Sequence, residues 1–216
     1  MRPIRAVIFD FHATLVDQGD ADAWLDRAVA RAGAGADLGD ADRAAIARRL
    51  DDIWMHARDI DPESTRDLAA QHHRDVFHGV MVGHAPDELR HALYDVMLEL
   101  WVAYEEAPGV LMELRRRGIR TCVLSNVGVD IRPVMEREGL TADAVVLSCE
   151  VGVVKPDPRI FQEALDALGV VADETLMVGD QWRDDAAAST LGIRSLILPR
   201  TRGRHHGLDI ALRLAD

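Results

Sequence analysis

Lysine is almost missing from this chain of 216 residues. Among its 25 basic residues only Lys155 is a lysine, and all the others are arginines. This bias indicates that arginine is used wherever either cation serves. A single retained lysine therefore suggests a site that needs a compact ammonium and has no room for a planar, forked guanidinium. Lys155 is the first candidate functional residue.

Cysteines and long apolar runs are scarce as well. The two cysteines, Cys122 and Cys149, lie beside strand-like apolar segments, which favours buried free thiols over a disulfide. No apolar run approaches the roughly 18 residues that a membrane-spanning helix requires. Residues 1–5 lead directly into a strand-like run, so no secretory signal is predicted. We therefore expect a cytoplasmic globular protein without a membrane partner.

Positive charge is also in deficit, because the chain has a net charge of −12. A protein of this charge repels the phosphate backbone of nucleic acids, so a nucleic-acid partner is not expected. The same deficit makes a positive charge inside a pocket more informative, because an anion can be held only where such charge is concentrated.

Five short runs of apolar and β-branched residues predict strands that are buried on both faces. These runs are Ile4–Phe9, Arg120–Leu124, Ala144–Leu147, Thr175–Val178 and Arg194–Leu198. Helical patterns separate them from the second run onward, often with proline near the start and glycine just past the end. The alternation predicts an α/β fold, a doubly wound parallel sheet resembling a Rossmann fold.

The stretch between the first strand and the rest is different, because it has no comparable strand-like run. Its helical patterns cover Asp22–Ala32, Asp40–Arg58, Pro62–Val80 and Pro86–Tyr104, with turns predicted at Gly33–Gly39 and Gly79–Gly83. The sequence thus predicts a catalytic core of residues 1–15 and 108–216 and a smaller, all-helical insert of residues 16–107.

Polar residues follow four of the predicted strands. In order they are Asp10, His12 and Thr14; Ser125 and Asn126; Lys155; and Asp180, Asp184 and Asp185. Each of these residue types is common on its own in turns and helix caps. Ligands of open parallel sheets, however, bind beyond the carboxyl ends of the strands. Their joint placement therefore predicts a binding site at that edge.

Four segments carry a resemblance to a known family: VIFDFHATL around Asp10, LSN around Ser125, VKPDP around Lys155 and MVGDQWRDD around Asp180. Together and in this order they resemble the motifs of the haloacid dehalogenase superfamily, whose members are mostly phosphatases. The helical insert falls where that family places its cap domain.

The resemblance implies a nucleophile and a cofactor. Asp10 would attack phosphorus and form an aspartyl-phosphate. Mg²⁺ would be held by the carboxylates of Asp10 and Asp180 and by the main-chain carbonyl of His12, which are the hard oxygen ligands that this ion prefers. Asp184 or Asp185 would complete the metal site, and we favour Asp185.

The resemblance also implies how a substrate is bound. Thr14, Ser125 and the backbone of Asn126 would bind the phosphoryl group, and Lys155 would offset the charge between it and Asp10. The expected substrate is a small phosphorylated metabolite, and the expected assembly is a monomer or a homodimer.

His12 departs from the family pattern, because phosphatases of this family usually have a second Asp at this position to carry protons. Three interpretations are open. His12 itself is the acid and base, since its ordinary pKa lies near neutrality; substrate or water supplies the proton in a slow or specialised enzyme; or activity has been lost.

Two other functions are alternatives to the phosphatase interpretation. A metal-independent 2-haloacid dehalogenase would use the same Asp10, although the retained Asp180, Asp184 and Asp185 favour a metal. A catalytically silent module would keep the fold and bind a phosphorylated ligand. In the insert, Trp24, Trp54 and Trp101 are predicted to form the core and inner wall. The pair His72 and His73 is predicted to be solvated or capping.

Overall fold

Five parallel strands form the central sheet, in the order β5-β4-β1-β6-β7. Their bounds are β1 Ala6–Phe9, β4 Arg120–Ser125, β5 Ala144–Leu147, β6 Thr175–Gly179 and β7 Arg194–Ile197. The computed structural model describes residues 2–33 and 38–215. The prediction of a parallel α/β sheet is confirmed, and the strands differ from the predicted runs by no more than two residues at either end.

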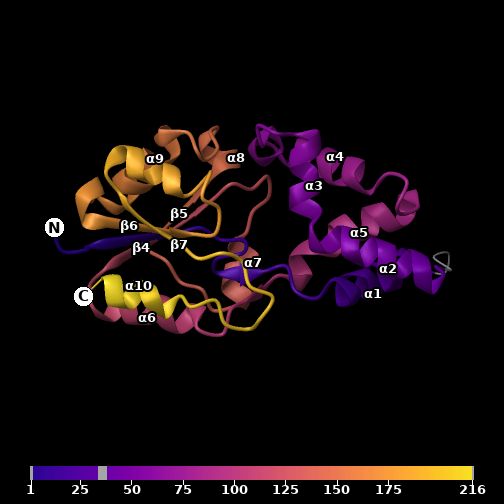
Figure 1. Ribbon diagram of the computed structural model, residues 1–216, viewed down its shortest axis with the longest axis horizontal. Helices are drawn as coiled ribbons and strands as arrows, with labels where there is room; N and C mark the ends of the chain where they lie inside the picture. Colours follow the sequence, from indigo (N-terminus) through magenta and orange to yellow (C-terminus); the bar gives the residue numbers. More distant parts are fainter. Residues whose placement is uncertain (1, 34–37, 216) are drawn as a thin grey trace.

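Helices cover both faces of this sheet (Figure 1). Helices α6, α7 and α10 lie over one face, and α8 and α9 lie over the other. Their bounds are α6 Ala107–Arg116, α7 Arg132–Arg137, α8 Ser148–Val151, α9 Pro158–Leu168 and α10 Asp209–Leu214, with 3₁₀ turns η2 Ala172–Glu174 and η3 Ala186–Leu191. In β1, Val7 and Phe9 pack into one of the two cores and Ala6 and Ile8 into the other, as expected of a strand buried on both faces.

The remaining helices form a second lobe beside the carboxyl ends of the strands, while both chain termini lie at the opposite end of the sheet (Figure 1). This helical lobe consists of α1 Ala21–Ala32, α2 Asp40–Asp51, α3 Ile53–Ile60, η1 Thr65–Leu68, α4 Ala70–Met81 and α5 Asp87–Leu100. Residues 34–37 of the predicted turn at Gly33–Gly39 lie outside the described residues. We call the other part of the structure the sheet lobe.

Three of the predicted helices in this lobe are wrong in extent, the first two because of local turns. The pattern over Asp40–Arg58 is broken at Asp52, which leaves the helical conformation, and α3 then packs against α4 instead of α1. The helix predicted from Pro62 begins only at Ala70. The carboxylate of Asp61 accepts hydrogen bonds from the backbone amides of Thr65 and Arg66, at 3.1 and 2.7 Å. Such local bonds favour a tight turn over the first turns of a helix.

A short antiparallel ribbon joins the two lobes. Val16–Asp17 (β2) pairs with Val102–Ala103 (β3), so that the two crossings of the chain between the lobes lie side by side. The helix predicted to extend to Tyr104 therefore ends at Leu100. Within the described residues, no helix is both long enough and apolar enough to cross a membrane.

The two lobes are in close contact at Gly128, in the loop after β4. A Cβ atom at this position would lie 2.6 Å from Cβ of His73 and 2.7 Å from the main-chain oxygen of Arg66, both in the helical lobe. Nearby, the hydroxyl of Ser148 donates a 2.6 Å hydrogen bond to the main-chain oxygen of Asp67. The helical lobe thus packs so closely against the sheet lobe that no side chain fits at Gly128.

We expect Gly128→Ala to lower stability by about 1–3 kcal/mol, because neither neighbouring atom is at the end of a flexible side chain. Calorimetry would show this as a lower melting temperature. Gly109→Ala is the matched control. Nothing lies within 4 Å of a Cβ there, and the site is within helix α6, so alanine should leave stability unchanged or raise it. Equal melting temperatures for Gly128→Ala and wild type would contradict the tight seating.

Candidate active site

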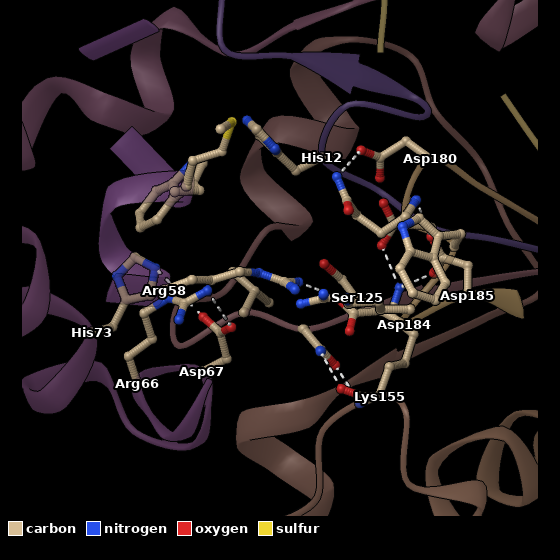
Figure 2. Close-up of a pocket in the computed structure, with 18 of the residues that line it drawn as sticks. His12, Arg58, Arg66, Asp67, His73, Ser125, Lys155, Asp180, Asp184 and Asp185 are labelled. Carbon is tan, nitrogen blue, oxygen red and sulfur yellow. Dashed lines mark hydrogen bonds and ion pairs between the residues drawn. The ribbon is translucent and has the colours of Figure 1, made fainter. Parts of the chain in front are cut away.

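A cavity of about 390 Å³ lies between the carboxyl ends of the strands and the helical lobe. Figure 2 shows charged side chains from both lobes around it. From the sheet lobe it is lined by Asp10, His12, Ser125, Asn126, Val127, Lys155, Asp180, Gln181, Trp182, Arg183, Asp184 and Asp185; from the helical lobe and the ribbon by Trp54, Met55, Arg58, Arg66, Asp67, His73 and Trp101. The structure brings together every predicted site residue except Thr14 on this surface.

Lys155 lies between two carboxylates at the base of the cavity. Its Nζ is 2.6 Å from Oδ1 of Asp10 and 2.6 Å from Oδ1 of Asp185, and all three residues are buried. Burial alone lowers the pKa of Lys155, but the charges of Asp10 and Asp185 outweigh burial and raise it. The ammonium is therefore fixed in its charged form beside the end of β1.

Carboxylates outnumber this cation. Oxygen atoms of Asp10, Asp180 and Asp185 lie within 4.8 Å of one another. Burial raises the pKa of Asp180 to about 6, and Asp185 contributes to the rise. Burial also raises the pKa of Asp10, against the lowering effect of Lys155. Two buried acids and a half-buried one with a single ammonium leave an excess of negative charge, and their hard oxygen atoms form a donor set that fits Mg²⁺.

The choice between Asp184 and Asp185 follows from their partners. Asp185 belongs to the acidic cluster, whereas the carboxylate of Asp184 forms an ion pair with Arg58 of the helical lobe. Asp184 therefore joins the two lobes at the cavity wall. This arrangement favours Asp185 as the candidate metal ligand, as the sequence interpretation does.

Backbone groups after β6 hold Asp185 in place. Its Oδ2 accepts a 2.9 Å hydrogen bond from the amide of Gln181, and a Cβ on Gly179 would lie only 2.2 Å from its carboxyl carbon. Only glycine therefore fits at the end of β6. The side-chain amide of Gln181 donates to Oδ2 of Asp180 at 2.9 Å. Gln181 thus orients two of the three acids, a role that the sequence interpretation missed although the residue lies within the fourth motif.

The side chain of Asn126 holds the loop that carries Lys155. Its side chain donates to the main-chain oxygen of Lys155 at 2.9 Å and accepts from the main-chain amide at 2.7 Å. The backbone of Asn126 thus remains for a ligand. Ser125 lines the cavity beside it. Thr14 is fully buried and does not line the cavity; its hydroxyl donates to Oδ2 of Asp10 at 3.3 Å, so it orients the acid instead of facing a ligand.

The ring of His12 packs among tryptophans. Its centroid is 5.0 Å from that of Trp101 and 6.4 Å from that of Trp54, and its Nε2 atom is buried without a hydrogen-bond partner in the described part of the chain. Burial lowers the pKa of His12 to about 4. The ring is therefore neutral at neutral pH and is a poor proton donor.

His73 is buried and lines the cavity, so the prediction of a solvated or capping role is wrong for this residue. Its Nδ1 lies 2.9 Å from the hydroxyl of Tyr94. The signal was present in the sequence, because His73, Val76, Phe77 and Val80 recur at helical spacing and form the buried face of α4. Trp54 and Trp101 line the cavity, as the predicted inner wall requires.

The fold, with acids and a lysine at the carboxyl ends of its strands, defines a hydrolase-type site in an α/β protein. A family model described as haloacid dehalogenase-like hydrolase matches residues 4–192. The chain therefore belongs to the haloacid dehalogenase-like hydrolases.

Individual relatives point to two activities. A phosphoserine phosphatase from Thermus thermophilus is 41% identical over 105 residues, which are 45% of this chain and 41% of that protein. An (S)-2-haloacid dehalogenase from Pseudomonas is 28% identical over 93% of this chain and 86% of its own length. The chain spans about half the length of the first curated relatives that it matches.

Solved structures agree in fold. The L-2-haloacid dehalogenase from Xanthobacter autotrophicus superposes with a TM-score of 0.67 and 24% identity, over 92% of this chain and 78% of that one. At this level of identity the similarity concerns the fold alone.

Proposed function

We propose that this chain is a Mg²⁺-dependent phosphatase that removes phosphate from a small phosphorylated metabolite through an aspartyl-phosphate. One observation carries the proposal: Asp10 contacts the buried ammonium of Lys155 on one side and lies within an acidic cluster on the other. A cavity of about 390 Å³ suits a small molecule.

In the proposed reaction an Oδ atom of Asp10 attacks phosphorus, and the bond from phosphorus to the leaving oxygen breaks. Lys155 reduces the repulsion between the carboxylate and the phosphate, while Thr14 fixes the orientation of Asp10. The hydroxyl of Ser125 and the backbone amide of Asn126 are proposed to donate hydrogen bonds to the phosphoryl oxygens. Water then attacks phosphorus and releases phosphate from Asp10.

The carboxylates of Asp10, Asp180 and Asp185, with the main-chain carbonyl of His12, would hold Mg²⁺. When bound, the ion offsets negative charge on the acids and on the phosphoryl group. Gln181 orients Asp180 and Asp185 for this purpose. The side chain of His12 does not suit the general-acid role, because the neutral ring is enclosed by tryptophans. We propose that it shapes the cavity wall.

Halide removal from a 2-haloacid is the second candidate function. Asp10 would attack carbon instead of phosphorus and form an ester that water hydrolyses. The aromatic wall of His12, Trp54 and Trp101 would suit the carbon chain and halogen of such a substrate, and the dehalogenase relative aligns over most of this chain. The excess of buried acids favours the phosphatase, since a metal-free site would leave their charge uncompensated.

A paired assay separates the two functions. We expect release of phosphate from nitrophenyl phosphate with Mg²⁺, and a loss of at least about 100-fold when a chelator removes the ion. Chloride release from 2-chloropropionate should be absent. Chelator-resistant chloride release would replace the proposal with the dehalogenase, and silence in both assays with retained phosphate binding would indicate a binding module.

A further inference from the structure

A leaving oxygen that departs from phosphorus needs a proton, and no carboxyl group among the described cavity-lining residues of the sheet lobe is free to give it. Asp10, Asp180 and Asp185 form the acidic cluster, and Lys155 is engaged by two of them. Asp184 is paired with Arg58. The proton must therefore come from elsewhere on the cavity wall.

In phosphoryl transfer the nucleophile and the leaving oxygen lie on opposite sides of phosphorus. Asp10 belongs to the sheet lobe, so the leaving group points toward the helical lobe. Figure 2 shows Asp67 on that side of the cavity, across from Lys155, Asp180 and Asp185. Among the described residues, Asp67 is the acid of the helical lobe that lines the cavity.

We propose that Asp67 carries the proton in this enzyme: its carboxyl group protonates the leaving oxygen and later takes a proton from the attacking water. In the first step Asp10 bonds to phosphorus, the bond between phosphorus and the leaving oxygen breaks, and that oxygen takes the proton of Asp67. In the second step water bonds to phosphorus, its proton passes to the carboxylate of Asp67, and the bond between phosphorus and Asp10 breaks. The inference rests on the proposed phosphatase function.

The surroundings of Asp67 allow a protonated carboxyl group. The residue is only 4% exposed, and its cationic partner is not tightly bonded: Oδ2 lies 3.4 Å from Nη2 of Arg66. Oδ1 lies 4.0 Å from Nε2 of His73. Both distances exceed those of a strong charge-assisted hydrogen bond, about 2.7–2.9 Å. Burial therefore influences the protonation of this carboxyl group more than ion pairing does.

Charged and titratable groups approach Asp67 from each neighbouring element: Asp61 and Arg66 along its own segment, His73 from α4, Arg58 from α3 and Asp184 from the sheet lobe. Burial outweighs the two arginines and raises the pKa of Asp67 to about 6. Burial, with a further contribution from Arg66, lowers the pKa of His73 to about 3, so this ring is neutral and does not compete as an acid. Asp67 is thus protonated below about pH 6 and loses its proton above it.

A series of aryl phosphates of similar shape tests the assignment: dinitrophenyl, nitrophenyl and phenyl phosphate, whose leaving oxygens become steadily more basic. Asp67→Asn should lower kcat/KM for phenyl phosphate by about 100-fold or more, because the basic phenolate needs the proton. The kcat/KM for dinitrophenyl phosphate should equal that of wild type, because its weakly basic leaving oxygen departs without a proton and kcat/KM reports the first step alone. This unchanged value also demonstrates that the variant is folded, while kcat should fall for every ester because the second step loses its base.

Asp61→Asn is the matched control. Asp61 pairs with the same Arg66, at 3.5 Å, but does not line the cavity. A loss of packing around Arg66 should alter all three rates by the same factor. If Asp67→Asn also lowers kcat/KM for all three esters equally, or for none of them, the assignment of Asp67 is overturned while the phosphatase function stands.

The wild type provides a second measurement that needs no variant. Its kcat/KM for phenyl phosphate should fall by about tenfold per pH unit above pH 6, while kcat/KM for dinitrophenyl phosphate should not show this limb. Parallel profiles would contradict the proposal. If wild type hydrolyses none of the three esters, or if Asp10→Asn hydrolyses them equally well, the proposed function itself fails.

Discussion

Replacement of Asp10 by asparagine is expected to abolish turnover, with a loss of roughly 10⁴-fold or more in kcat, as when a covalent nucleophile is removed from other hydrolases. The amide is a poor nucleophile, and the contact of Lys155 with a charged oxygen is lost. Steady-state kinetics on the best ester of the aryl series measures the effect. The expectation holds for both candidate functions, because each uses the carboxylate of Asp10 as nucleophile.

The stability of Asp10→Asn should equal or exceed that of wild type, although its turnover is lost. Asp185 and Asp180 repel the charge of Asp10, and Lys155 keeps its 2.6 Å contact with Asp185 in the variant. A melting temperature at or above that of wild type would thus exclude unfolding as the cause of inactivity. Asp184→Asn is the comparison: it breaks the pair with Arg58 but leaves the acidic cluster intact, so its loss should be far smaller. An Asp10→Asn enzyme that retains a tenth of the activity would refute the nucleophile assignment.

The sheet lobe could be predicted from sequence because its strands are short apolar runs with clear boundaries. The run Ala144–Leu147 matches β5 residue for residue. The ribbon of Val16–Asp17 and Val102–Ala103 could not be predicted, because two-residue strands have no periodicity of their own. Their pairing depends on a contact between distant parts of the chain.

The helical lobe illustrates the limits of periodicity. The apolar pattern continues through Asp52, yet the helix breaks there, and the side chain of Asp61 forms a turn where a helix is expected. Both differences matter for the site. The turn carries Arg66 and Asp67, and α3 carries Arg58. A single straight helix would place these side chains elsewhere.

The same difference between the two lobes applies to the candidate site: most of its sheet-lobe residues could be predicted from the sequence, and its helical-lobe residues could not. Residues that follow strands were predicted because parallel strands bring their carboxyl ends to one edge, and Asp10, Lys155 and Asp185 indeed lie in contact. Thr14 was assigned to the substrate because of its position, whereas the structure turns its hydroxyl toward Asp10. Residues of the helical lobe, such as Asp67, belong to no motif. They reach the cavity only because the two lobes close on each other.

Lys155→Met should have the second large effect, on both turnover and stability. The substitution leaves the buried carboxylates of Asp10 and Asp185 without a cation, a change that costs about 3–5 kcal/mol when a buried pair is broken. Protonation of Asp180, whose pKa is already about 6, should recover part of this loss. Turnover should fall by about 100-fold or more, since no positive side chain remains beside Asp10 to offset the phosphate.

The response to Mg²⁺ distinguishes the effect of Lys155→Met on stability from its effect on turnover. In wild type the ammonium already neutralises part of the cluster, so Mg²⁺ should raise the melting temperature moderately. In Lys155→Met the excess of negative charge is larger, so the same concentration should raise the melting temperature further while turnover stays low. Lys155→Arg should also stay slow, because a buried position with two contacts of 2.6 Å has no room for the guanidinium. Full activity of the arginine variant would show that any cation suffices there, and the lone lysine would lose its functional meaning.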